Sequence, residues 1–230
     1  MEIVYEDNHL IAVNKNCHEI VQGDKTGDTP LSETIKLWLK EKYQKPGNVF
    51  LGVTHRLDRP VTGIVLFAKT SKSLARMNEL FRHGEIQKTY LAIVKNRPPH
   101  DVATLTHWLT RNEQQNKSYA HPNEVAGSQK SILHYRLKSQ SERYFLLEIK
   151  LETGRHHQIR AQLAYIKCPI KGDLKYGAER SNPDGGISLH ALSAAFIHPV
   201  SKHPVHVFAP PPPDRLWLEL IKEAGILPTE

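Results

Sequence analysis

The chain has 230 residues, with 31 lysines and arginines against 24 aspartates and glutamates and a formal net charge of +7. This length can bury a sizeable core, whereas a 39% apolar content without any apolar run near the roughly 18 residues of a spanning helix excludes a membrane-embedded class. Two cysteines and no apolar leader predict a cytoplasmic protein without a disulfide scaffold, and the basic charge favours a polyanionic partner.

Strand and helix patterns are interleaved along the chain, which predicts a mixed α and β fold. Residues 3–5 and 10–13 are apolar segments around a polar tetrapeptide, a pattern typical of a β-hairpin. A helix is expected next, capped by Asp28 or Thr29 with Pro30 at its first helical position.

The middle and end of the chain continue this alternation. Strands are expected at residues 64–68, 88–94, 132–138, 144–151 and 205–209. Helices are expected from Ser71 to Gly84, at 157–167, and from an Asp214 cap to Gly225. The polar segment 97–130 is expected to be a surface loop or to face a partner, and the lack of any linker predicts one domain over residues 1–230.

The first candidate site is the polar segment 55–63, which is bounded by proline and glycine and comes just before a buried strand. This arrangement predicts an ordered loop held against the sheet. Asp58 stands between Arg56 and Arg59, and nearby cations lower the pKa of a carboxylate and so favour its ionised form. The alternative is an aspartate that caps a turn or forms a structural ion pair.

The second candidate is the segment 153–160, which ends a strand and begins a helix. An arginine in the first turns of a helix opposes the helix dipole, so Arg160 is expected to have a negative partner, either Asp58 or a phosphate. A basic surface cluster is the alternative. Tyr90 alternates with apolar residues, which is typical of a core aromatic, but beside Asp58 it could stack on a base.

The 14 histidines show no metal-ligand spacing, and no nucleotide-binding or serine-hydrolase motif occurs in the chain. Neither a metal nor another cofactor is therefore expected.

Several ordered motifs resemble those of the RluA-type pseudouridine synthases. Residues 55–63 resemble that family's H-R-L-D-x-x-T-S-G motif, although Val61 and Thr62 stand where the family has Thr-Ser. Further stretches match in the family's order: 5–15, 88–92, 153–160, 171–173, 176–177, 189–191, 196–199 and 208–210. The resemblance therefore covers nearly the whole chain, as a catalytic domain without the S4 RNA-binding domain of many relatives.

The resemblance implies an α+β pseudouridine synthase fold, with a central mixed and largely antiparallel sheet, flanking helices and a catalytic cleft across the sheet. It implies that Asp58 is the catalytic aspartate, that Tyr90 stacks against the target uracil, and that Arg160 pairs with Asp58. The residues expected to contact RNA are His55, Arg56, Arg59, Arg155, Gln158 and Ile159. Lysines expected to add to a basic RNA surface are Lys15, Lys117, Lys130, Lys171 and Lys175.

The predicted function is isomerisation of uridine to pseudouridine in structured rRNA or tRNA by a monomeric enzyme, with base flipping and Asp58 as nucleophile or as base at the sugar. One alternative is an RNA-binding or RNA-folding module on the same fold, since fold does not guarantee activity. A hydrolase acting on free nucleosides would leave the basic charge and the missing second acid unexplained.

Overall fold

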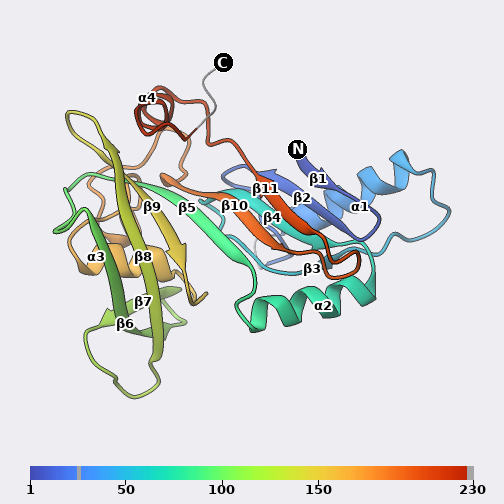
Figure 1. Ribbon diagram of the computed structural model, residues 1–230, viewed down its shortest axis with the longest axis horizontal. Coiled ribbons are helices and arrows are strands. Elements are labelled where there is room, and N and C mark those ends of the chain that lie inside the picture. The colour runs from blue at the N-terminus through green and yellow to red at the C-terminus, as the bar shows by residue number, and fades with distance from the viewer. Residues whose placement is uncertain (25–26, 227–230) are drawn as a thin grey trace. The chain divides into compact units, whose positions relative to one another are not determined.

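The computed structural model describes residues 1–24 and 27–226, which group into two compact units (Figure 1). Unit 1 comprises Met1–Gln87 and Leu192–Pro210, and unit 2 comprises Lys88–Ala191 and the described part of Pro211–Glu230. A single domain over residues 1–230 stays a prediction.

Unit 1 is built on antiparallel strand pairs. Its strands are β1 (Glu2–Glu6), β2 (Leu10–Lys15), β3 (Gly52–Val53), β4 (Thr62–Ala68), β10 (Leu189–Ile197, from Leu192 onward) and β11 (Pro204–Phe208). β2 pairs with both β1 and β4, β3 pairs with β4, and β10 pairs with β11. The predicted N-terminal hairpin and the strands near 64–68 and 205–209 are therefore confirmed.

Strand β4 supplies side chains to two separate cores, because successive residues of a strand point to opposite faces. Ile64 and Leu66 pack in one core with Met77 of helix α2 (Ser71–Arg82). Val65 and Phe67 pack in the other core with helix α1 (Leu31–Lys42). Burial of both faces explains why this segment is a continuous apolar run and does not alternate.

Helix α1 begins one residue later than the sequence predicts, because Pro30 is its N-cap and no side chain caps it. The expected cap from Asp28 or Thr29 is wrong. Asp28 instead forms an ion pair with Arg59 at 2.7 Å. The N–H of Leu31, the first helical residue, donates to the carbonyl of Ile20 at 2.7 Å. Backbone groups therefore satisfy the start of this helix.

Helix α2 is capped at its N-terminus by two hydroxyl side chains, since its first turn contains no acidic residue. The Thr70 hydroxyl accepts from the N–H of Ser73 at 3.1 Å, and the Ser73 hydroxyl accepts in return from the N–H of Thr70. Gly84 follows the helix with φ +70°, the left-handed conformation that favours glycine. The predicted helix from Ser71 to Gly84 is confirmed.

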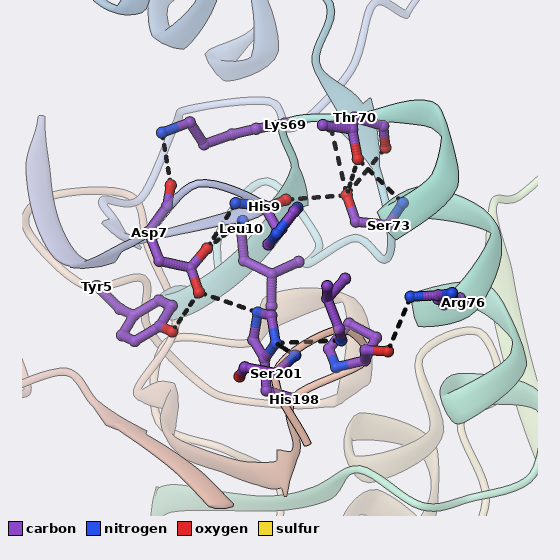
Figure 2. A network of polar contacts seen from close by, with 12 residues as sticks. Tyr5, Asp7, His9, Leu10, Lys69, Thr70, Ser73, Arg76, His198 and Ser201 are labelled. Atoms are coloured by element: carbon purple, nitrogen blue, oxygen red, sulfur yellow. Dashed lines mark hydrogen bonds and ion pairs between the residues drawn. The ribbon is translucent and has the colours of Figure 1, made fainter. Parts of the chain in front are cut away.

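A polar network joins the β1–β2 turn to the β10–β11 turn within unit 1 (Figure 2). Asp7 Oδ2 accepts from the Tyr5 hydroxyl at 2.7 Å and lies 2.9 Å from His198 Nε2. The turn N–H groups that donate to Asp7 Oδ1 or His198 Nδ1 are those of His9, Leu10, Val200 and Ser201. Because Nδ1 accepts, neutral His198 carries its proton on Nε2, facing Asp7.

Unit 2 is an antiparallel sheet in the order β5-β9-β8-β6-β7. Its strands are β5 (Gln87–Val94), β6 (Val102–Asn112), β7 (Lys117–His121), β8 (Gln129–Gln140) and β9 (Phe145–Leu151). Its helices are α3 (Gln158–Tyr165), the short 3-10 helix η1 (Leu174–Tyr176) and α4 (Arg215–Glu223), which Asp214 caps through the N–H groups of Leu216 and Trp217. The helices and strands predicted in this part of the chain are confirmed.

The prediction of a loop over residues 97–130 is wrong, because β6 and β7 occupy much of it. Val102, Thr104 and Thr106 of β6 are exposed, whereas Leu109 lies in the core with α3. A strand with a solvated face can carry threonine, histidine and asparagine, so its pattern resembles that of a loop.

Strands and helices together confirm the predicted α+β class. No helix in the described ranges combines the length and apolarity needed to cross a bilayer.

Candidate active site

Asp58 lies in unit 1, in the loop between β3 and β4, and the backbone on its C-terminal side is fixed by hydrogen bonds. Its carbonyl accepts from the N–H of Val61 at 3.0 Å, which closes a tight turn. The carbonyl of Arg59 accepts from the N–H of His18 at 3.1 Å. Leu57 packs against the core beneath α1, and Val61 is 2% exposed. The half-buried Asp58 is therefore carried by an ordered loop, as the sequence predicts.

Lys15 supports this loop from inside the protein. Its ammonium donates to the carbonyls of Asn16, Arg59 and Val61 at 2.8, 3.0 and 2.7 Å, and the residue is 1% exposed. Burial lowers the pKa of Lys15 to about 8, against the opposing effect of nearby groups that include Asp58. The prediction that Lys15 belongs to the RNA-facing surface is wrong, because the end of β2 turns its side chain inward.

The three basic residues near Asp58 differ in their surroundings. Arg56 is exposed. Arg59 forms ion pairs with Asp28 at 2.7 Å and, more weakly, with Asp24 at 3.6 Å. His55 Nε2 accepts from a backbone N–H of β4 at 3.0 Å, and its ring lies 4.8 Å from that of Phe81. Arg56 is thus the most exposed of the three.

Tyr90 and Arg160 both lie in unit 2. Tyr90 is paired with Ile149 across β5 and β9 and is 7% exposed. The Arg160 side chain is 6% exposed and forms two parallel bonds with Asp173, from Nε to Oδ2 at 2.7 Å and from NH2 to Oδ1 at 2.9 Å. The predicted pairing of Arg160 with Asp58 joins residues of different units and stays a prediction, as does the predicted cleft.

Sequence reasoning missed Asp173 as a partner of Arg160. The signal was present, because residues 171–173 form one of the matched motifs, but no pattern linked that motif to the helix thirteen residues earlier. A carboxylate with 1% exposure beside a buried guanidinium becomes visible only once the fold is known.

The remaining predicted RNA contacts lie at the start of α3. Arg155 is exposed, whereas Gln158 and Ile159 are 3% and 5% exposed. The Gln158 amide holds the preceding turn: Oε1 accepts from the N–H of Arg155 and from the Thr153 hydroxyl, and Nε2 donates to the carbonyl of Ile132. Gln158 and Ile159 thus lie inside the protein, and contact of all three residues with RNA stays a prediction.

Across residues 1–24 and 27–226, no group of three or more histidine, cysteine, aspartate or glutamate side chains is arranged to hold a metal ion.

Comparison with known proteins places these residues in a wider context. A family model described as RNA pseudouridylate synthase matches residues 9–165. The ribosomal large subunit pseudouridine synthase D of Xylella fastidiosa is 30% identical over 93% of this chain and 67% of its own length. Two proteins named tRNA pseudouridine synthase C are similar: that of Pectobacterium carotovorum is 31% identical over 89% of this chain, and that of Vibrio cholerae is 29% identical over 98%. This chain spans 57% of the former's length and 96% of the latter's.

Two solved structures share the fold. Human RNA Pseudouridylate Synthase Domain Containing 4 aligns with a TM-score of 0.77 at 20% identity and covers 97% of this chain and 93% of its own. Human RNA Pseudouridylate Synthase Domain Containing 1 aligns with a TM-score of 0.70 at 21% identity and covers 92% and 83%. These likenesses confirm the predicted fold.

Proposed function

The chain belongs to the RNA pseudouridylate synthase family and is an RNA pseudouridine synthase, and from this premise we propose that it modifies a uridine of structured ribosomal or transfer RNA with Asp58 as the catalytic residue. The observation that carries this assignment is the Asp58 loop. Its backbone is held by Lys15 and by the 58–61 turn, so a half-buried carboxylate is kept in a defined place.

One carboxylate is sufficient for this chemistry. The reaction breaks the bond between N1 of uracil and C1′ of ribose, turns the base and joins C5 to C1′, while C5 loses a proton and N1 gains one. An ionised aspartate can attack C1′ or take a proton from the sugar, and it stabilises positive charge that develops at C1′. Because the base is retained and no water attacks, the paired acids of glycoside hydrolysis are unnecessary.

Tyr90 and Arg160 are assigned the two supporting roles. The target base must leave its stack to reach Asp58, and the Tyr90 ring offers an aromatic face for it. Arg160 would hold the Asp58 carboxylate in place through its guanidinium. The exposed Arg56 and Arg155 are the best placed of the predicted RNA contacts to meet phosphates, and His55, Arg59, Gln158 and Ile159 would shape the surface behind them.

The same proposal includes a monomeric, cytoplasmic enzyme with one catalytic domain. The composition and the two thiols support the cytoplasmic part of this proposal, since Cys17 and Cys168 form no disulfide within the described ranges.

Release of tritium from RNA labelled at C5 of uridine tests the proposed function directly, because C5 loses its hydrogen only if the base is rejoined through that carbon. The RNA is taken from cells that lack this gene. Wild-type protein is expected to release tritium, whereas Asp58→Asn, which keeps the side-chain shape but removes the charge, is expected to release none. Both are expected to bind the RNA.

Asp101→Asn is the matched control, since its carboxylate is exposed and forms an ion pair with Arg97 at 2.7 Å. It is expected to match wild type. Tritium release by Asp58→Asn would remove Asp58 from the reaction. RNA binding by a wild-type protein that releases no tritium would favour the non-catalytic RNA-binding alternative.

A further inference from the structure

Three lysine ammonium groups gather around the ring of Tyr43 at the C-terminal end of α1. The ammonium groups of Lys42, Lys45 and Lys69 lie 5.3, 5.7 and 5.0 Å from the centroid of that ring. Tyr43 is 46% exposed, and Lys42 and Lys45 are exposed as well. We call Tyr43, these three lysines and Glu6 the Tyr43 cluster.

Glu6 is the one carboxylate of the Tyr43 cluster. Its Oε2 accepts from Lys42 at 2.6 Å, and its Oε1 accepts from Lys69 at 2.7 Å and from the Tyr43 hydroxyl at 2.8 Å. Burial alone would raise the pKa of Glu6, but these hydrogen bonds lower it to about 2, so Glu6 is ionised at neutral pH. One negative charge therefore faces three positive charges.

The other charged residues of α1 do not remove this excess of positive charge. Lys40 and Glu41 are exposed in the last turn of the helix and have opposite charges. Lys36 forms an ion pair with Glu33 at 2.7 Å. A surface that concentrates charge of one sign attracts a partner of the opposite sign. The Tyr43 cluster therefore favours an anionic partner.

The backbone fixes the two segments that supply the lysines. The N–H of Lys45 donates to the carbonyl of Lys40 at 3.0 Å, and Gln44 between them has φ +47°, so α1 ends in a Schellman turn. Lys69 follows β4, and its ammonium also donates to the carbonyl of Asp7 at 2.6 Å (Figure 2). The helix dipole favours basic residues at the end of α1, but it does not explain why Lys69 joins them.

The Tyr43 cluster and Asp58 lie at opposite ends of β4, and both belong to unit 1. Asp58 comes before the strand, and Lys69 comes directly after it. A strand of seven residues spans roughly 20 Å, because each residue advances about 3.3 Å. A uridine that reacts at Asp58 is therefore out of reach of the cluster, and only a more distant segment of the same RNA could meet it.

We propose that the Tyr43 cluster binds a backbone phosphate of the RNA substrate, away from the uridine that is modified. This inference rests on the proposed function, which supplies the RNA. An ammonium group has three N–H donors, and Lys42 uses one of them on Glu6, so Lys42 and Lys45 can donate to phosphate oxygens. Glu6 and Tyr43 hold the ammonium groups together before RNA arrives, which lowers the entropy cost of binding.

Lys45→Gln is the first variant that tests this contact, because Lys45 is exposed and lies beyond the end of α1. Transfer RNA and ribosomal RNA are purified separately from cells that lack this gene, and filter binding to each is measured over a series of salt concentrations. On the RNA that wild type modifies, the slope of log affinity against log salt is expected to fall by about 0.7 to 0.9, the value for one phosphate contact. The corresponding loss of affinity at 0.15 M salt is about fourfold.

A double variant, Lys42→Gln with Lys45→Gln, is expected to reduce the slope about twice as much. Tritium release by both variants is expected to show KM for RNA raised by the factor that affinity falls, and kcat within about twofold of wild type, because the cluster is remote from Asp58. Thermal unfolding is measured alongside, and a melting temperature close to that of wild type is expected for Lys45→Gln.

Lys222→Gln is the matched control. It removes the same charge from the exposed last turn of α4, where no RNA contact is predicted, and it is expected to keep the wild-type slope. An equal fall of the slope in Lys222→Gln and Lys45→Gln would assign the effect to net charge and overturn the inference.

The outcomes separate this inference from the proposed function. A wild-type slope in both Lys45→Gln and the double variant, with tritium release still dependent on Asp58, would overturn the phosphate contact alone. A kcat at saturating RNA that falls as far as affinity does would also contradict a contact remote from the reaction. A wild-type protein that releases no tritium, but whose RNA binding depends on Lys45, would overturn the proposed function and support the phosphate contact.

Discussion

Lys15 is the residue whose environment differs most from what its sequence context suggests. Three carbonyl oxygens surround its ammonium, which matches the three protons of the charged form. Its pKa of about 8 means that most molecules keep this form at neutral pH, although burial disfavours the charge. Burial of this cation is unfavourable by itself, but the three hydrogen bonds that it donates hold the backbone next to Asp58 in place.

Lys15→Met tests this role, because methionine has a similar length and no donor. Leaving buried carbonyls without a partner is expected to lower the free energy of unfolding at pH 7 by about 1–3 kcal/mol. Chemical denaturation provides the measurement. The value of kcat is expected to fall more than KM for RNA rises, since the loop loses its anchor while the exposed RNA contacts remain.

The pH dependence of the same variant provides a second measurement. The folded pKa of about 8 lies below the ordinary value of 10.5, so between these values the unfolded chain binds more protons than the folded chain. The stability of wild type relative to Lys15→Met is therefore expected to increase as pH rises from 8 to 10.5. A difference that stays constant or decreases over this range would contradict burial of a charged Lys15.

At the residue scale, sequence proximity predicted the Asp58 loop but not the cation beneath it. Arg59 follows Asp58 directly, yet its side chain pairs with Asp28. Lys15 is far away in sequence and reaches the loop because β2 pairs with β4 in a register that sets Lys15 opposite Gly63. Asp173 illustrates the same limit in unit 2. Strand register and loop packing decide such contacts, and neither is encoded in a short motif.

At the scale of elements, the Asp7–His198 contact joins two hairpin turns of unit 1 that lie far apart in sequence (Figure 2). Burial raises the pKa of Asp7, but the hydrogen bonds from Tyr5, His9 and Leu10 outweigh it, so the net shift is downward. Burial lowers the pKa of His198, and Asp7 opposes this effect without reversing it. Folding thus favours the ionised form of Asp7 and the neutral form of His198, which are the forms present at neutral pH.

Acid is expected to weaken this connection in two steps. The stabilising effect of neutral His198 is complete above its ordinary pKa of 6.5 and is lost as pH falls through its lower folded value. The stabilising effect of ionised Asp7 is complete above its ordinary pKa of 3.8 and is lost at still lower pH.

His198→Asn keeps an acceptor near Nδ1 for the turn but does not reach Asp7. It is expected to cost about 1 kcal/mol at pH 7 and to remove the first step from a plot of unfolding free energy against pH. If the first step persisted in His198→Asn, the loss of stability in that pH range would belong to another group.

Most elements were predictable from the sequence because their apolar residues follow the period of a helix or strand. The exceptions share a physical cause. β6 and β7 have a solvated face, so polar residues interrupt their pattern, and β3 has only two residues. The start of α1 was displaced because a backbone carbonyl, which no side-chain pattern reports, satisfies its first N–H group.

At the scale of the whole molecule, a net charge of +7 suits an RNA substrate. Each phosphate that a lysine or arginine neutralises releases bound counterions, so affinity for RNA is expected to fall as salt rises. Arg56→Ala is expected to reduce the slope of log affinity against log salt by about 0.7, the value for one phosphate contact on a single strand.

Filter binding over a series of salt concentrations measures this slope. Arg143→Ala removes the same charge from the exposed β8–β9 turn and is expected to leave the slope unchanged, because none of the predicted RNA contacts lies in that turn. Equal slopes for wild type and Arg56→Ala would show that Arg56 does not contact a phosphate.

The two-sided burial of β4 has a consequence for motion in unit 1. Neither α1 nor α2 can detach without exposing one of the two cores that this strand supplies, so the amide hydrogens of β4 reach solvent only when the surrounding sheet opens as a whole. The Asp58 loop leads directly into this strand. Fluctuations that an exposed loop normally undergoes on the nanosecond scale are therefore expected to be damped at the end where this loop joins β4.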